Sequence, residues 1–385
     1  MRKLRVGIIG MGFVGILHLD AVSRIGEAEV AAVADANPAL AKKAAETYGI
    51  GYYCTDIHDM MEHVELDVIH NCTPNFLHRE INTSVLKKGL HLFSEKPLAR
   101  TVEEVEEVLA EMKKHPELVT GINHCYRMNP MIQEIRHKIR AGEIGTPYLV
   151  HGSYLQDHLL YETDYNWRLD PEVNGPSRAI ADIGVHWMDL IQCILEDEIT
   201  EVCTDLVTVM PVRKKPKGEV ATFSKNVNTD YEEIEVSTED YGSVLFKTKK
   251  GLHGVYYVSQ VSAGHGCCLN FEIDGSKASF AWNQETPNQV WMGRKDEANL
   301  VYDRNPVSLS DCVAANYTHL AKGHPEGWND ALRNNISAFY RYILDGKKER
   351  GEKPSFATFE EALYLTKIVE AVLESAATKS WITIA

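Results

Sequence analysis

The sequence predicts an α/β fold with a doubly wound parallel sheet, followed by an α+β region with a large, mostly antiparallel open sheet. Short apolar runs alternate with amphipathic helical patterns at the start of the chain, as in a parallel sheet covered on both faces. Strands rich in β-branched and aromatic residues, separated by turn signals, dominate residues 202–291. We therefore expect two domains, residues 1–126 and 127–385, with the last helix packing back on the first domain.

The first domain is expected to hold five strands, joined by right-handed crossovers. The apolar runs place strands at 4–9, 30–34, 68–72, 91–94 and 119–123, and the helical patterns cover 13–25, 38–48, 76–88 and 102–114. Asn37 and Thr101 are expected to cap the second and fourth of these helices.

The pattern changes after residue 127. We expect a helix over 131–141, a strand over 147–156, a polar loop over 158–177 and a helix over 182–195. Helices are expected again over 330–344 and 359–377, after the strand-rich region.

Composition excludes several classes of protein. The chain has 385 residues, 44% of them hydrophobic and 25% charged, which is typical of a globular protein. A formal charge of −15 argues against nucleic acid as a partner. No run approaches the roughly 20 apolar residues of a membrane span, so no membrane association is expected. The eight cysteines form no C-x-x-C pair, which indicates reduced thiols and a cytoplasmic location.

The strongest local motif is Gly10-Met11-Gly12-Phe13-Val14-Gly15, between a predicted strand and a predicted helix. In this context G-x-G-x-x-G predicts a dinucleotide site. Gly10 allows a tight turn, Gly12 lets a pyrophosphate approach the backbone, and Gly15 lets the helix pack closely on the strand. The helix N-terminus would then face the phosphates. A glycine turn without a ligand is the alternative.

Asp35 ends the second strand, 20 residues after Gly15 (35 − 15). A carboxylate at this position accepts hydrogen bonds from the ribose hydroxyls and repels a 2′-phosphate. Neither Ala36 nor Asn37 supplies an arginine to neutralise such a phosphate. NAD is therefore favoured over NADP.

Polar residues follow two further strands. Cys72-Thr73-Pro74-Asn75 ends the third predicted strand, with His78 one turn into the next helix, and Glu95-Lys96-Pro97 ends the fourth. Ligands of open parallel sheets bind outside the carboxyl ends of the strands. A lysine there can polarise an alcohol or carbonyl oxygen, although a single lysine is more often a solvated surface residue.

A third group lies on the predicted helix at 182–195. Asp182 and His186 are four residues apart and share a helix face. A carboxylate beside an imidazole can orient it as a general base, although such a pair is often only structural. A metal site is conceivable, but no H-E-x-x-H motif or cysteine-rich partner accompanies the pair. We expect no bound metal.

Together these motifs resemble the glucose–fructose oxidoreductase / inositol dehydrogenase / rhizopine catabolism protein (Gfo/Idh/MocA) family. The resemblance covers essentially the whole chain, and its combination of motifs is much more specific than any one of them. It also includes Tyr126-Arg127, Trp167-Arg168, the segment Thr238-Glu239-Asp240-Tyr241 and the terminal Trp381-Ile382-Thr383-Ile384.

The resemblance implies roles for particular residues. Lys96, Asp182 and His186 would be catalytic and would contact substrate. Thr73, Pro74, Asn75, His78, Glu95 and Lys96 would contact the cofactor with the glycine loop and Asp35, and Trp167 and Arg168 would close over it from the second domain. A homodimer or homotetramer through the C-terminal sheet is also implied.

The predicted reaction is reversible oxidation of a secondary ring alcohol of a sugar, glycoside or cyclitol. His186 would take the hydroxyl proton and Lys96 would stabilise the oxygen. Polar residues expected to recognise the other hydroxyls are Tyr126, Arg127, Gln156, His158 and Tyr165. Many relatives have two glycines in the loop before the Asp182 helix, where this chain has Arg178. We expect this cation near the pocket entrance.

Two other functions fit the same residues. A glycosidase on this fold could oxidise its substrate transiently with NAD, eliminate the aglycone and reduce the ring again. A sensor could bind the dinucleotide without turnover, but it would not need Lys96, Asp182 and His186.

Overall fold

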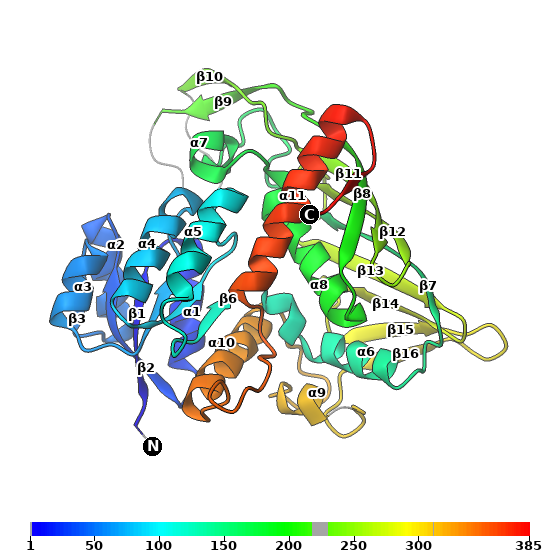
Figure 1. The fold of residues 1–385 in the computed structure, drawn as a ribbon, viewed down its shortest axis with the longest axis horizontal. Coiled ribbons are helices and arrows are strands. Elements are labelled where there is room, and N and C mark those ends of the chain that lie inside the picture. Colours follow the sequence, from blue (N-terminus) through cyan, green and yellow to red (C-terminus); the bar gives the residue numbers. More distant parts are fainter. Residues whose placement is uncertain (1, 218–229, 311) are drawn as a thin grey trace. The chain divides into compact units, whose positions relative to one another are not determined.

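The structure is a computed structural model that describes residues 2–217, 230–310 and 312–385. The chain divides into two units (Figure 1). The first contains Met1–Cys125 and Leu332–Thr366, and the second contains Tyr126–Ala331 and Lys367–Ala385. Helices α10 (Trp328–Leu344) and α11 (Phe359–Thr378) each include a boundary, so the two units share both of these helices.

The first unit is built on a six-stranded sheet in the order β3-β2-β1-β4-β5-β6, with every neighbouring pair parallel. Its strands are β1 (Leu4–Ile9), β2 (Ala28–Ala34), β3 (Tyr52–Cys54), β4 (Val68–Asn71), β5 (His91–Ser94) and β6 (Thr120–Ile122). The order reverses direction between β1 and β4. Open α/β sheets bind ligands at such a switch point, outside the carboxyl ends of the strands.

Five helices connect these strands: α1 (Phe13–Ser23), α2 (Pro38–Tyr48), α3 (Ile57–His63), α4 (Asn75–Lys87) and α5 (Val102–Met112). The predicted caps are confirmed, because the side chain of Asn37 accepts from Ala39 N and that of Thr101 accepts from Glu104 N. The sequence reading missed β3 and α3, which are only three and seven residues long. Asp56, which caps α3 by accepting from His58 N, was the available signal.

The second unit is built on a nine-stranded sheet in the order β16-β15-β14-β13-β7-β12-β11-β8-β17. Its β7–β12 pair is parallel and its other pairs are antiparallel. The strands are β7 (Pro147–Leu155), β8 (Ile199–Val207), β11 (Tyr241–Thr248), β12 (His253–Ser259), β13 (Cys268–Gly275), β14 (Ser279–Asn283), β15 (Gln289–Gly293), β16 (Leu300–Asp303) and β17 (Ile382–Thr383). This is the predicted fold class.

Strands β9 (Val212–Pro216) and β10 (Tyr231–Glu235) form a separate antiparallel pair. Residues 218–229 of the strand-rich range lie outside the described residues. The helices are α6 (Pro130–Arg140), α7 (Pro171–Asn174), α8 (Val185–Leu195) and α9 (Cys312–Asn316), with 3-10 turns η1 (Cys125–Met128) and η2 (Trp167–Leu169) and a π-helical turn η3 (Ile180–Gly184). The expected loop at 158–177 therefore contains two short helical turns.

Helix α8 packs on the nine-stranded sheet through Trp187. The indole is fully buried, stacks on Tyr256 of β12 at 4.6 Å between ring centroids, and donates to Asn270 O at 3.0 Å. This packing fixes the rotation of α8 and therefore the direction of His186, its neighbour in the chain. Within the described ranges, none of the helices combines the length and the apolar character needed to cross a membrane.

A buried charge cluster holds the loop that leads into η3. Arg178 and Arg213 both contact Asp240 Oδ1, at 2.6 and 2.7 Å, and all three side chains are fully buried. Arg178 also donates to Thr238 Oγ1 and to Gln260 Oε1. The expectation that Arg178 is a cation near the pocket entrance is therefore wrong, because its charge is buried and paired inside the second unit.

The Arg178–Asp240–Arg213 cluster makes stability depend on acid pH. Burial raises the pKa of Asp240, but Arg178, Met210 N and Arg213 together lower it more, and the net pKa lies below its ordinary value. The ionised Asp240 carboxylate therefore stabilises the fold at every pH above its pKa in the unfolded chain, which is about 3.9. This stabilisation is lost as the pH falls through the lower pKa of Asp240 in the folded state.

We predict that Asp240→Asn lowers the free energy of unfolding by about 3–5 kcal/mol at pH 7, because it removes the carboxylate that the two buried arginines share. Chemical denaturation should show this loss at pH 7 and a smaller difference from the wild type below about pH 4. An exposed control, Asp230→Asn, should change stability by less than about 0.5 kcal/mol. Equal stability of Asp240→Asn and wild type at pH 7 would contradict a stabilising cluster.

Candidate active site

The glycine loop between β1 and α1 has the shape of a dinucleotide cradle. Gly10 has φ +89°, and a Cβ at this position would lie 2.5 Å from Cys72 O. A Cβ at Gly15 would lie 1.7 Å from Gly10 O, so the loop closes only with glycine there. A Cβ at Gly12, by contrast, would meet nothing within 4 Å. Gly12 therefore faces open space, as the approach of a pyrophosphate requires.

The N-terminus of α1 also suits an anion. Gly12 and Phe13 are exposed, and no acidic side chain lies in the first turn of this eleven-residue helix. The N-terminal peptide groups of a helix carry a partial positive charge and attract phosphate. The loop and helix together fit the diphosphate of NAD.

Asp35 lies between the glycine loop and the start of α2. Its Oδ2 accepts from Met11 N at 2.6 Å and its Oδ1 accepts from Asn37 N at 2.8 Å. The carboxylate is half-buried, so both oxygens retain lone pairs for a further partner. This geometry fits a ribose diol and disfavours a second negative charge beside it.

Glu95, at the end of β5, is a buried carboxylate with several donors. Its Oε1 accepts from Asn123 Nδ2 at 2.6 Å and lies 2.8 Å from His18 Nε2, while its Oε2 accepts from Lys96 N at 3.2 Å. Burial raises the pKa of Glu95, but the hydrogen bonds of His18 and Asn123 lower it more. The pKa is therefore below its ordinary value, and the side chain is ionised at neutral pH.

A buried chain of hydrogen bonds extends from Glu95 into the core. His18 Nδ1 lies 2.9 Å from His70 Nδ1, and His70 Nε2 lies 2.8 Å from the Tyr340 hydroxyl. All three side chains are fully buried. Burial, together with the nearby His18, holds the pKa of His70 well below its ordinary value, so this ring is neutral.

One assignment of donors and acceptors satisfies every group in this chain. Tyr340 donates to His70 Nε2, His70 Nδ1–H donates to His18 Nδ1, and His18 Nε2–H donates to Glu95. The sequence reading missed His18, His70 and Tyr340. The available signal was a histidine at position 70 within a strand expected to be buried in a parallel sheet, because a buried polar group needs a partner.

His78 connects two loops through its ring nitrogens. Its ring is fully buried, with Nδ1 2.6 Å from Pro97 O and Nε2 2.7 Å from Thr73 O. Burial lowers the pKa of His78, and the two carbonyls and Glu95 only partly offset this. The prediction that His78 contacts the cofactor is corrected, because its side chain is inaccessible. It ties the Thr73 turn to the segment after Lys96.

The second unit places two tyrosines against His186. Tyr126 lies edge-on to the imidazole at 5.2 Å between centroids, and the Tyr154 ring lies at 6.3 Å. The two hydroxyls are 2.8 Å apart, and Tyr154 Oη lies 3.0 Å from Cys267 Sγ. Of these residues, the sequence reading named His186 and Tyr126 and missed Tyr154 and Cys267.

Asp182 lies in the π-helical turn η3, a helix type that is frequent at functional sites. Its Oδ1 is 3.2 Å from Arg168 Nε, and its Oδ2 accepts from Gln260 Nε2 at 3.0 Å. The Arg168 guanidinium also stacks over the Trp167 ring at 4.3 Å. The structure therefore brings Trp167, Arg168 and Asp182 together within the second unit.

Two polar residues follow β7. Gln156 is 7% exposed, and its Oε1 is buried without a hydrogen-bond partner among the described residues. Burial lowers the pKa of His158 to about 4, although Asp182 partly offsets this. His158 is therefore neutral at physiological pH. The Gln156 amide is likewise uncharged.

Two other predicted substrate residues have structural roles. The Arg127 guanidinium is buried and pairs with Asp189, with Nε 2.7 Å from Oδ2. Tyr165 packs against a small apolar cluster of Leu159, Leu169 and Val236. The expectation that Arg127 recognises substrate is therefore corrected, since its charge is already neutralised inside the second unit.

We predict that Tyr340→Phe lowers the free energy of unfolding by about 1–3 kcal/mol, because it leaves His70 Nε2 buried without a donor. Tyr53→Phe, at an exposed tyrosine of β3, is the matched control and should change stability by less than about 0.5 kcal/mol. Denaturant unfolding measures both. A Tyr340→Phe protein as stable as the control would exclude the proposed chain of donors.

Comparison with known proteins places the chain in a family. Residues 4–122 match the model of an oxidoreductase family with an NAD-binding Rossmann fold, and residues 132–281 match the GFO/IDH/MocA C-terminal domain. Levoglucosan dehydrogenase of Pseudarthrobacter phenanthrenivorans is 27% identical over 406 positions, covering 100% of this chain and 99% of the relative. The uncharacterized oxidoreductase YrbE of Bacillus subtilis is 30% identical over 296 residues, 77% and 78% of the two chains.

Solved structures support the same family assignment. An oxidoreductase domain protein from Kribbella flavida superposes with a TM-score of 0.88 at 27% identity, and each chain is covered over 100% of its length. The fold of this chain, with both of its sheets, therefore has a counterpart in a solved structure of an oxidoreductase domain protein. The chain belongs to the GFO/IDH/MocA family of NAD-binding oxidoreductases.

Proposed function

We propose that the protein is an NAD-dependent dehydrogenase that oxidises a secondary ring alcohol of a neutral sugar, glycoside or cyclitol. The observation that carries this proposal is the set of side chains around His186. An imidazole beside Tyr126 and Tyr154, with Asp182 four residues before it, can bind a hydroxyl and accept its proton. The full-length similarity to a levoglucosan dehydrogenase supports a sugar substrate.

The cofactor is proposed to be NAD, held by the loop Gly10–Gly15 and by Asp35. Thr73, Pro74, Asn75, Glu95, Lys96, Trp167 and Arg168 are proposed to complete its site. When bound, NAD supplies a nicotinamide that accepts a hydride from the alcohol carbon. Asp35 favours NAD over NADP because its carboxylate repels a 2′-phosphate.

We assign one catalytic role to each of three side chains. His186 takes the proton from the substrate hydroxyl. The Lys96 ammonium donates a hydrogen bond to the same oxygen and stabilises its developing negative charge. Asp182, fixed by Arg168 and Gln260, is proposed to orient the imidazole.

The neutral groups near Asp182 favour a neutral substrate. His158 carries no charge above about pH 4, and Gln156, two residues before it, has an uncharged amide. A sugar or cyclitol offers several hydroxyls, which can hydrogen-bond with such groups without introducing charge.

A homo-oligomer through the nine-stranded sheet is also proposed. One face of this sheet exposes Leu149, Leu245, Val255 and Tyr257 at 51%, 49%, 39% and 42%. These side chains lie on adjacent strands, since Leu245 pairs with Val255. A contiguous exposed apolar patch is typical of an interface, and a second copy of the chain would cover it.

The function is tested with purified protein, NAD and a panel of cyclitols, aldoses and glycosides, with NADH absorbance as the readout. We expect NADH to form with one class of sugar. His186→Gln and Lys96→Met should lower kcat/KM by about 10²–10⁴, and His186→Gln should leave NAD affinity unchanged. His63→Gln and Lys42→Met, at exposed positions, serve as matched controls.

Two results would overturn this proposal. Release of free sugar from a glycoside in the presence of NAD, without net NADH, would show a glycosidase that oxidises its substrate transiently. Binding of NAD without turnover of any panel member, in the wild type and controls alike, would point to a sensor.

Cofactor selection gives a separate prediction. Asp35→Asn removes the negative charge, so the ratio of kcat/KM with NAD to kcat/KM with NADP should fall by at least about tenfold, equivalent to roughly 1.4 kcal/mol of lost discrimination. Asp59→Asn on α3 is the control. An unchanged ratio would show that Asp35 does not face the ribose.

Assembly is tested by light scattering. The double variant Leu245→Glu/Val255→Glu should have a smaller mass than the wild type, because two carboxylates per chain would be buried unpaired at the interface. Val301→Glu, at an exposed position on β16, should keep the wild-type mass. A wild-type protein that is monomeric at micromolar concentration would refute the interface.

A further inference from the structure

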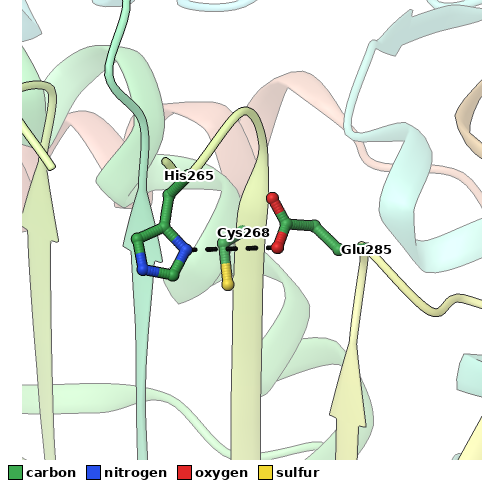
Figure 2. A group of neighbouring side chains, drawn as sticks. All are labelled: His265, Cys268 and Glu285. Atoms are coloured by element: carbon green, nitrogen blue, oxygen red, sulfur yellow. Dashed lines mark ion pairs between the residues drawn. The ribbon is translucent and has the colours of Figure 1, made fainter. Parts of the chain in front are cut away.

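Three side chains with metal-binding atoms meet at one end of the nine-stranded sheet. His265 lies in the loop between β12 and β13, Cys268 begins β13, and Glu285 lies just after β14. One ligand atom from each residue lies within 4.8 Å of the other two. Figure 2 shows the imidazole and the carboxylate on either side of the Cys268 thiol.

Glu285 is held in place by the backbone. Its Oε1 accepts from Gly266 N at 3.2 Å and from Cys267 N at 3.4 Å. Its Oε2 is directed at His265 Nδ1, at 4.0 Å. This separation is too long for a hydrogen bond.

His265 supplies a second, independent indication. Its Nδ1 is shielded from solvent and has no hydrogen-bond partner among the described residues. Such atoms are rare in folded proteins and point to a missing partner. Two ligand atoms on one tetrahedral ion, with bonds of about 2.0–2.3 Å, lie roughly 3.4 Å apart. The 4.0 Å separation can therefore close on an ion with a small side-chain movement.

The Cys268 thiol completes the set. It is 4% exposed and lies 3.6 Å from Asn270 Nδ2 and 3.8 Å from Asn283 Oδ1. Burial raises the pKa of this thiol, so it is protonated in the absence of an ion. A divalent transition metal displaces the proton of a coordinating thiol.

We propose that His265, Cys268 and Glu285 bind one thiophilic divalent transition-metal ion of the Zn²⁺ class, with water as the fourth ligand. One nitrogen, one sulfur and one oxygen donor form a set that zinc accepts and that magnesium and calcium do not prefer. Binding converts the Cys268 thiol to a thiolate and releases one proton to solvent, with no change in oxidation state. The thiolate and carboxylate then balance the charge of the ion.

The surroundings allow an ion to enter. The side chains of His265 and Glu285 are 41% and 39% exposed, so the site opens to solvent. Asp157, which follows β7, accepts from Gly264 N at 3.1 Å through its Oδ2, so a further carboxylate contacts the loop that carries His265. The sequence spacing did not predict this site, because Glu285 lies 17 residues after Cys268 (285 − 268).

The proposed metal site lies directly beside Cys267, which contacts the tyrosines near His186. Cys267 Sγ lies 3.0 Å from Tyr154 Oη and 3.4 Å from Tyr126 Oη, beside His186. An ion bound by the residues on both sides of Cys267 would fix the loop that carries this thiol. Metal binding itself does not depend on the proposed dehydrogenase activity.

The test uses the full-length protein, stripped of metal and titrated with Co²⁺ under reducing conditions. Cobalt replaces zinc in such sites, and a thiolate ligand gives a charge-transfer band in the near ultraviolet. We expect this band to saturate at one Co²⁺ per chain and to disappear when Zn²⁺ is added. Cys268→Ser should abolish the band, and His265→Ala and Glu285→Gln should each weaken Co²⁺ binding at least tenfold.

Two controls separate this site from other donors. Cys203→Ser removes a thiol on β8, and His151→Ala removes a histidine from a second group with Glu272 and Asp274, which has no thiol. Both should keep the band. Circular dichroism and melting temperature establish that each variant is folded. The proposal is overturned if the folded wild type shows no thiolate band, or if the band survives in Cys268→Ser.

Discussion

The buried carboxylate of Glu95 is the constraint on which the first unit depends. An ionised group in a protein interior is costly unless several donors surround it. Here the donors come from separate parts of the chain, since His18 lies on α1, Asn123 follows β6, and Lys96 N is the next peptide group. Meeting this requirement fixes α1 and the ends of β5 and β6 relative to one another. The glycine loop and Lys96 are attached to the same elements.

The second unit meets a similar requirement at Asp240. Arg178 and Arg213 share this carboxylate, and Arg178 is only four residues before Asp182. Gln260 bridges the two regions, because it accepts from Arg178 and donates to Asp182. The Arg178–Asp240–Arg213 cluster thus holds the start of the π-helical turn, and Trp187 fixes α8 on the sheet. In both units, residues proposed to take part in catalysis are neighbours of buried carboxylates that accept several hydrogen bonds.

Local patterns predicted the fold well where a structural requirement is confined to a few consecutive residues. The glycine spacing predicted the loop, because the positive φ of Gly10 and the close approach of Gly15 to Gly10 O are conditions set within a few residues. Asn37 and Thr101 predicted helix starts for the same reason. Short elements such as β3 escaped, since three residues carry too little periodicity to recognise.

Side-chain partners distant in sequence could not be predicted in this way. Arg178 and Arg127 looked like free cations for a substrate, but their partners, Asp240 and Asp189, lie 62 residues further along the chain (240 − 178 and 189 − 127). The His18–His70–Tyr340 chain and the group of His265, Cys268 and Glu285 likewise depend on tertiary folding. A charged or polar residue therefore had a predictable environment only where its own motif fixed that environment, as for Asp35, which accepts from Met11 N of the glycine loop.

The central claim is that a hydride passes from a ring carbon of a sugar to NAD. Transfer of deuterium tests it most directly, with glucose and myo-inositol deuterated at their ring carbons and mass spectrometry of the cofactor after incubation with the wild-type protein. The account predicts net NADH that carries one deuterium from the sugar, and no such product with His186→Gln over the same time. Turnover that leaves the cofactor unlabelled, or no turnover of any deuterated sugar that the protein binds, would contradict the account.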